Sequence, residues 1–225
     1  QTDNQGNKLN NNQYYMANGP LLTKWAGEIS PQNVMPEYPR PNLTRSQWIN
    51  LNGLWEFEKT NDTDNNPPFG RQLSSNILVP FSPESALSGV MEHADRVWYR
   101  RSFEVPKVWD QKRTILHFGA IDWESTVYVN GHYIGSHKGG YDSFKFDITD
   151  FLHQDREQEL VVGVFDPTDS GEQVRGKQMH DPKDIWYSAS TGIWQTVWLE
   201  PVSYINIDAV RFTPDIDRGG VNLEV

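Results

Sequence analysis

The 225-residue sequence contains no cysteine, which excludes disulfides, cysteine-based zinc sites and thiol nucleophiles. It also lacks any run of roughly 18 apolar residues, the length that predicts a membrane-spanning helix, so no membrane span is expected. Positive charge is scarce, because 20 basic residues stand against 30 acidic ones, for a formal net charge of −10. Nucleic-acid binding depends on lysine and arginine that neutralise phosphates, and a nucleic-acid partner is therefore not expected.

Helical periodicity is missing as well. From Val97 onward, short apolar segments alternate with turn residues at a spacing that leaves no window for a long amphipathic helix, which predicts an all-β sandwich. The pair Asn130-Gly131 predicts a tight hairpin, because both central residues of a type I′ turn need positive φ. Trp55 and Phe57 predict a half-buried strand within 48–59. Further strands are expected at 97–105, 114–118, 124–129, 132–137, 143–147, 159–165 and 194–200.

The two ends of the chain differ from this pattern. Residues 1–47 are rich in Asn, Gln and Pro without sustained periodicity, which predicts an extended arm whose aromatic side chains lie against a folded surface. Residues 204–225 resume an apolar alternation that we expect to open a second β domain. The first residues have neither the basic nor the apolar part of a signal peptide, but a start at Gln1 is compatible with one already removed. A secreted or periplasmic protein is expected, with a cytoplasmic one as the alternative.

Several motifs follow one another in the main segment, 48–203. Together they resemble the N-terminal sugar-binding-type domain of glycoside hydrolase family 2, the family of β-galactosidases, β-glucuronidases and β-mannosidases. The resemblance implies a galactose-binding-like jelly roll over 48–203, followed by the start of an immunoglobulin-like sandwich at 204–225. The motifs are LNGLWEF at 51–57, VPFSPES at 79–85, WYRRSFEVP at 98–106, FGAIDWESTVYVNG at 118–131, GGYDSFKFDIT from Gly139 and TGIWQTVWLEP at 191–201.

The resemblance also implies that the chemistry is done elsewhere. Glycoside hydrolysis needs two positioned carboxyl groups, which in this family lie on a (β/α)₈ barrel, and nothing in this sequence alternates strand and helix as a barrel does. We therefore expect no catalytic residue and no cofactor in this chain. It is interpreted as the accessory domain of a β-galactosidase-like glycosidase, whose partners are a β-glycoside and the barrel and immunoglobulin-like domain of the same polypeptide. A stand-alone carbohydrate-binding or adhesion module is the competing hypothesis, and a purely structural interaction domain is a third.

The candidate binding residues are Arg175, Asp184, Trp186 and Tyr187, all in the long loop before Thr191. By resemblance, Asp184 matches an aspartate that reaches the sugar in the barrel, and a carboxylate suits this because it accepts hydrogen bonds from neighbouring hydroxyls. The alternative is a solvated loop carboxylate or an Asx turn. Strand alternation does not require large side chains at Trp186 and Tyr187, so they are expected to face a ligand or a partner domain, or only solvent. Arg175 could equally make a structural ion pair.

Other aromatic and histidine residues are interpreted as structural. Large strand residues are needed to fill a sandwich, so Trp98, Phe103, Phe118, Trp123 and Trp198 are expected in the core. His132, His137 and His180 have no metal-ligand spacing with nearby carboxylates, so no transition-metal site is expected. Oxygen ligation of calcium or sodium is left open. The segment MEHADRV, at 91–97, lacks the asparagine that β-galactosidases of the family can contribute at this point.

Overall fold

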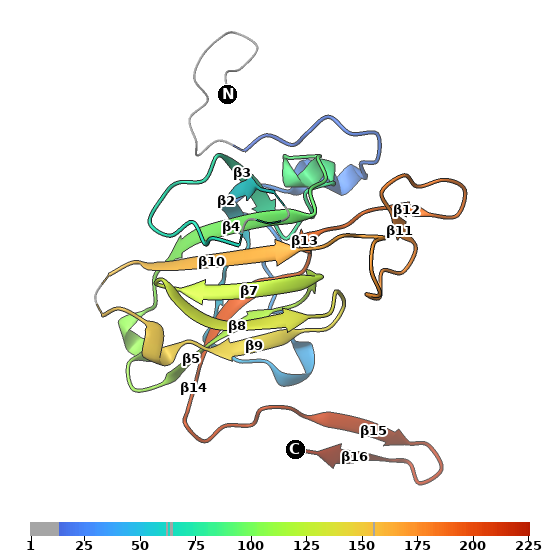
Figure 1. Ribbon diagram of the computed structural model, residues 1–225. Helices are drawn as coiled ribbons and strands as arrows, with labels where there is room; N and C mark the ends of the chain where they lie inside the picture. The colour runs from blue at the N-terminus through green and yellow to red at the C-terminus, as the bar shows by residue number, and fades with distance from the viewer. Residues whose placement is uncertain (1–13, 62, 64, 155) are drawn as a thin grey trace.

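The computed structural model describes residues 14–225 apart from 62, 64 and 155, and its main body is a pair of antiparallel sheets, with three two-stranded sheets beside them (Figure 1). The larger sheet has the order β3-β2-β4-β10-β7-β8, and the smaller has the order β1-β14-β5-β9. The strands of the larger sheet are β2 (Gly53–Lys59), β3 (Ser75–Val79), β4 (Arg96–Phe103), β7 (Glu124–Val129), β8 (His132–Lys138) and β10 (Gln158–Phe165). Those of the smaller are β1 (Ile49–Asn50), β5 (Arg113–Phe118), β9 (Phe144–Asp147) and β14 (Val197–Val202).

Helical structure in the described residues is limited to short 3₁₀ turns. These are η1 (Lys24–Glu28), η2 (Pro41–Leu43), η3 (Ala86–Ser88), η4 (Lys107–Trp109) and η5 (Thr149–Phe151). The prediction of an all-β sandwich is therefore confirmed. No helix within the described part of the chain is long and apolar enough to cross a membrane.

The core lies between the two sheets, where the inward residues of both meet in one apolar cluster. Strand β2 alternates buried and partly exposed residues, and both Trp55 and Phe57 are 1% exposed and meet Tyr99 edge to face. Four of the five aromatic residues expected in the core are buried, namely Trp98, Phe103, Phe118 and Trp198. Trp123 is only partly buried, and the ammonium group of Lys138 lies 5.6 Å from the centre of its ring.

The eight predicted strands correspond to eight strands of the two sheets, with shifts of a few residues at their ends. The predicted hairpin joins β7 to β8 through Asn130 and Gly131, whose φ values are 51° and 82°. Strand β3 at the edge of the larger sheet was missed, because its short apolar run is enclosed by serine and proline residues.

The two ends of the chain behave differently. In the N-terminal segment, Tyr14 donates a hydrogen bond to the carbonyl of Leu87, and Tyr38 donates one to Glu200, so both aromatics contact the sandwich. The first thirteen residues of the predicted arm lie outside the described residues. At the other end, β15 (Arg211–Asp215) and β16 (Gly220–Glu224) form a hairpin whose large apolar side chains are exposed. Figure 1 shows this hairpin set apart from the two sheets. The immunoglobulin-like assignment of 204–225 stays a prediction.

Candidate functional site

The four predicted binding residues lie on one long loop, 166–191, between β10 and β13 (Gly192–Ile193). The loop contains two short strands, β11 (Gln178–Met179) and β12 (Tyr187–Ser188), which pair in parallel. Figure 1 shows this loop extending from one end of the sandwich, beyond β13. All four candidates therefore lie within one protruding segment.

The tip of this loop is held by its own backbone. The amide of Trp186 donates to the carbonyl of Lys183 over 3.0 Å, and the enclosed Asp184 adopts a φ of 55°. Asp184 is exposed, so its carboxylate faces solvent rather than the sandwich. A positive φ is tolerated better by aspartate than by most residues, which explains why the chain turns here. The geometry leaves Asp184 available for an external hydrogen-bond donor.

Arg175 and Trp186 are brought together, although eleven positions separate them. The guanidinium carbon of Arg175 lies 6.0 Å from the centre of the Trp186 ring, at the edge of cation–π range. Arg175 also donates from Nη1 to the carbonyl of Asp169 over 2.7 Å, which fixes its direction. Trp186 is 38% exposed and Tyr187 66% exposed. The loop thus presents two aromatic rings and a cation to solvent, a combination that suits a sugar or a second protein surface.

The base of the loop is fastened to the sandwich through buried polar groups. Gln178 donates from Nε2 to Asp122 over 2.9 Å and accepts the backbone amide of Ser190 over 2.6 Å. The hydroxyl of Thr191 donates to Asp166 over 3.1 Å. Gln178 thus joins the loop to Asp122 at the end of β6 (Ile121–Asp122), and the other two bonds close the loop on itself, so the base is held while the tip is exposed.

Three carboxyl groups gather beneath this base. Burial raises the pKa of Asp122 to about 6, and the charges of Asp166 and Glu84 add to the shift against the hydrogen bond from Gln178. Burial also raises the pKa of Asp166, with Glu84 contributing, against hydrogen bonds from Thr168 and Thr191. Three acidic side chains therefore lie close together at this end of the sandwich, largely shielded from solvent.

A second loop joins the site because of strand register. Strands β4 and β10 are antiparallel, and Arg96 at the start of one pairs with Phe165 at the end of the other. The residues before β4 therefore lie beside those after β10, and the amide of Asp166 donates to the carbonyl of Asp95 over 2.8 Å. His93, from the same segment, packs its ring edge to face against that of His180, with centroids 4.7 Å apart.

The histidines were the part of the site that sequence spacing could not reveal. The spacing of His180 to nearby carboxylates in the sequence predicted no site, whereas in the structure its neighbours include His93 and Asp95, from before β4. The only available signal was the antiparallel pairing of the two strands that precede and follow these segments. The expectation of no transition-metal site stays a prediction.

Comparison with known proteins identifies the domain. The family model described as glycosyl hydrolases family 2, sugar binding domain, matches residues 28–201. The chain belongs to this family. The match begins within the segment predicted as an arm, in agreement with the contact between Tyr38 and Glu200. The motif-based resemblance is thereby confirmed.

Individual relatives of this family 2 domain are glycosidases. A β-galactosidase of Thermoanaerobacter pseudethanolicus is 31% identical over 52% of this chain and 15% of its own length. A β-glucuronidase of Paenibacillus borealis is 29% identical over 56% of this chain and 22% of its own length. Among solved structures, a Faecalibacterium prausnitzii β-glucuronidase matches 84% of this chain and 37% of its own with a TM-score of 0.64 and 21% identity. The chain therefore spans about a fifth or less of these two curated relatives.

Proposed function

We propose that this chain is the accessory domain of a longer retaining exo-β-glycosidase, β-galactosidase-like in activity, and that the loop 166–191 faces its catalytic barrel. The observation that carries the proposal is the pairing of Arg175 with Trp186 on a loop that is rigid at its base and exposed at its tip. Ile185 and Tyr187 beside them are 64% and 66% exposed. Apolar groups gathered in this way on an anchored loop suit burial against a partner surface.

In this proposal the loop borders the sugar pocket without supplying the reacting carboxyl groups. The exposed Asp184 carboxylate accepts hydrogen bonds from two neighbouring sugar hydroxyls. The face of Trp186 or Tyr187 packs on the apolar C–H face of a pyranose. These contacts orient the substrate, and such orientation is a recognised source of rate enhancement.

The relatives named above leave two sugar classes to be separated. One is described as a β-galactosidase and the other as a β-glucuronidase. A glucuronide carries a carboxylate, which a cation such as Arg175 would attract, whereas a galactoside does not. We propose β-galactosides as the first substrate class because the β-galactosidase is the relative with 31% identity, and we test β-glucuronides beside them because Arg175 would suit their carboxylate.

The test compares the 225-residue chain with the whole protein encoded by its gene, using chromogenic β-galactoside, β-glucuronide and β-mannoside substrates. Turnover only by the whole protein supports the proposal, and the preferred substrate names the sugar. Inactivity of the whole protein on all three substrates, together with glycan binding by the chain alone, would support the stand-alone carbohydrate-binding module instead.

A matched pair of variants in the active whole protein tests the loop itself. Tyr187→Ala removes an aromatic ring from the loop, and Tyr133→Ala removes one of similar exposure, 58%, from β8. We expect kcat/KM to fall about 10-fold for the first, the equivalent of about 1.4 kcal/mol, and to stay unchanged for the second. Equal effects of the two variants would place the substrate away from this loop.

A further inference from the structure

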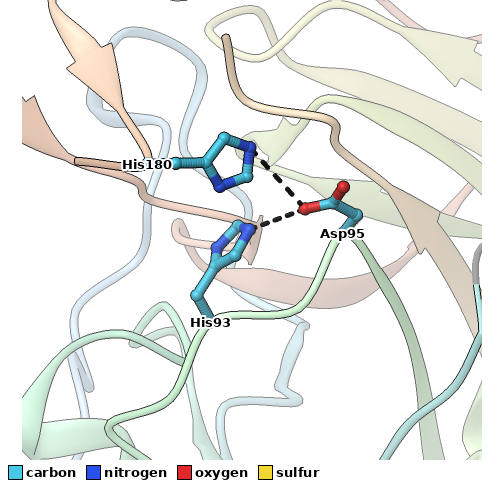
Figure 2. A group of neighbouring side chains, drawn as sticks. All are labelled: His93, Asp95 and His180. Carbon is cyan, nitrogen blue, oxygen red and sulfur yellow. Dashed lines mark hydrogen bonds and ion pairs between the residues drawn. The ribbon is translucent and has the colours of Figure 1, made fainter. Parts of the chain in front are cut away.

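The segment before β4 and the long loop after β10 bring three metal-binding side chains together: His93, Asp95 and His180 (Figure 2). His93 Nε2 lies 2.7 Å from Asp95 Oδ1, and His180 Nε2 lies 3.8 Å from the same oxygen. One ligand atom from each residue falls within 4.8 Å of the other two. Figure 2 shows both imidazole rings directed toward the carboxylate.

These spacings fit a small divalent transition metal. Zinc binds imidazole nitrogen and carboxylate oxygen at roughly 2.0–2.2 Å in a tetrahedron, which places neighbouring ligand atoms about 3.3 Å apart. The two measured separations, 2.7 Å and 3.8 Å, lie on either side of that value. An ion therefore requires only small side-chain adjustments. The side chains of His93, Asp95 and His180 are 27%, 27% and 36% exposed, so the fourth position can hold water.

The surroundings of His93 are those of a metal ligand. Its other ring nitrogen, Nδ1, lies 2.8 Å from Glu84 Oε1. A carboxylate that accepts a hydrogen bond from the distal nitrogen fixes the tautomer and ring orientation of a coordinating histidine, and such partners accompany nearly all histidine ligands. Glu84 is itself held, because its second oxygen accepts the amide of Thr191 over 3.1 Å. Nε2 of His93 is thus aimed at the cluster by a fixed partner.

The oxygen atoms around His180 point to a cation at the same place. Its Nε2 lies 3.2 Å from the carbonyl oxygen of Pro167 and 3.4 Å from Asp169 Oδ1, in addition to Asp95. Two carboxylates and a carbonyl surround one imidazole nitrogen, so the local charge is negative. Asp169 also accepts the backbone amide of His180, which keeps its carboxylate beside the cluster.

We propose that His93, Asp95 and His180 form a binding site for one divalent transition-metal ion of the zinc class, which clasps the loop 166–191 to the segment before β4. His93 and Asp95 come from the segment before β4, and His180 comes from the loop after β10. The ion therefore cross-links segments far apart in the sequence. Its role is structural, because it holds the loop at His180, beside the hydrogen bond from Gln178 to Asp122, whereas Thr191 and Asp166 close the two ends of the loop.

The test uses the untagged chain after treatment with a chelator and exchange into metal-free buffer. Titration with Zn²⁺ in a calorimeter is expected to give one ion per chain, and Co²⁺ is expected to give the visible absorption of a tetrahedral site. His180→Ala should abolish both signals, and so should Asp95→Asn. His132→Ala, which removes an exposed histidine from β8, should leave both unchanged.

Limited proteolysis tests the same site by measuring how accessible the loop is to trypsin. Lys177 and Lys183 lie on either side of His180, and both are exposed. Zn²⁺ should slow tryptic cleavage after these lysines at least several-fold in the native chain and leave the His180→Ala variant unaffected. No binding by the native chain, or binding that survives both His180→Ala and Asp95→Asn, would overturn the proposal. Because these readouts need no substrate, they are independent of the glycosidase assay.

Discussion

Glu200 is the residue whose replacement most directly tests how the N-terminal segment is held. Its side chain on β14 is 1% exposed. Oε2 accepts the hydroxyl of Tyr38 over 2.6 Å, and Oε1 lies 2.6 Å from Arg40 Nη2 and 3.3 Å from Arg45 Nε. The same oxygen lies 3.0 Å from His117 Nε2. One buried carboxylate therefore joins the segment before β1 to the smaller sheet.

The magnitude follows from the pKa of this group. Burial alone would raise the pKa of Glu200, but hydrogen bonds from His117 and Tyr38 and the charge of Arg40 outweigh it and lower the pKa from 4.5 to about 2. The charge thus stabilises the fold by about 3 kcal/mol at neutral pH, because each pKa unit corresponds to about 1.4 kcal/mol. Arg40 and Arg45 are 23% and 21% exposed, which reduces the expected loss to about 2 kcal/mol.

The assay is urea unfolding of native and Glu200→Gln chains, followed by tryptophan fluorescence. Glutamine keeps the shape and one acceptor oxygen, so the difference isolates the charge. A carboxyl group with a lowered folded pKa contributes fully above pH 4.5 and loses its contribution as the pH falls toward 2. We expect the two chains to differ by about 2 kcal/mol at pH 7 and to converge below pH 3.

Tyr38→Phe serves as the control, because it removes one hydrogen bond and leaves the carboxylate with its cations. It should cost about 1 kcal/mol at pH 7. A loss from Glu200→Gln below about 0.5 kcal/mol at pH 7, or one that does not shrink on acidification, would refute this account of the buried network.

Two further predictions concern the loop and its base. Gly192 has a φ of 83°, and a Cβ at this position would lie 2.1 Å from the hydroxyl of buried Tyr99. Gly192→Ala should therefore lower the free energy of unfolding by more than about 3 kcal/mol, measured by urea unfolding. Gly131→Ala, at φ 82° with open space around it, should cost only about 1 kcal/mol; equal losses would mean that backbone strain, not the clash, dominates. Asp122→Asn should stabilise the chain by about 1–3 kcal/mol at pH 8 and have little effect at pH 4. The reason is that the folded pKa of Asp122 is raised to about 6, so its ionised form destabilises the native state increasingly as the pH rises from about 4 to 6. Stability curves at the two pH values check this, and an Asn variant less stable at pH 8 would show that the hydrogen bond from Gln178 requires the charge.

Local chemistry accounts for what the sequence predicted well. The Asn130-Gly131 turn and the alternation around Trp55 each depend on a few adjacent residues, and both appear in the structure as expected. Strand β3 was missed because edge strands are short and their flanking residues resemble loops. The contact of the N-terminal segment with a folded surface was predicted from its aromatic residues, but its buried partner Glu200 was not. Glu200 lies in the motif at 191–201, whose tryptophans and alternating pattern predict core packing and give no sign of a buried carboxylate.

The candidate site depends on information that no local pattern contains. Arg175, Asp184, Trp186 and Tyr187 could be nominated together because they share one loop. The histidine cluster could not, because it exists only through the register that pairs Arg96 with Phe165. A shift of one residue in that pairing would turn alternate side chains to the opposite face and move the segment before β4 away from the loop. The same register thus connects the proposed metal clasp to the proposed substrate loop, since an ion at His180 would limit the movement of the segment that carries Asp184 and Trp186.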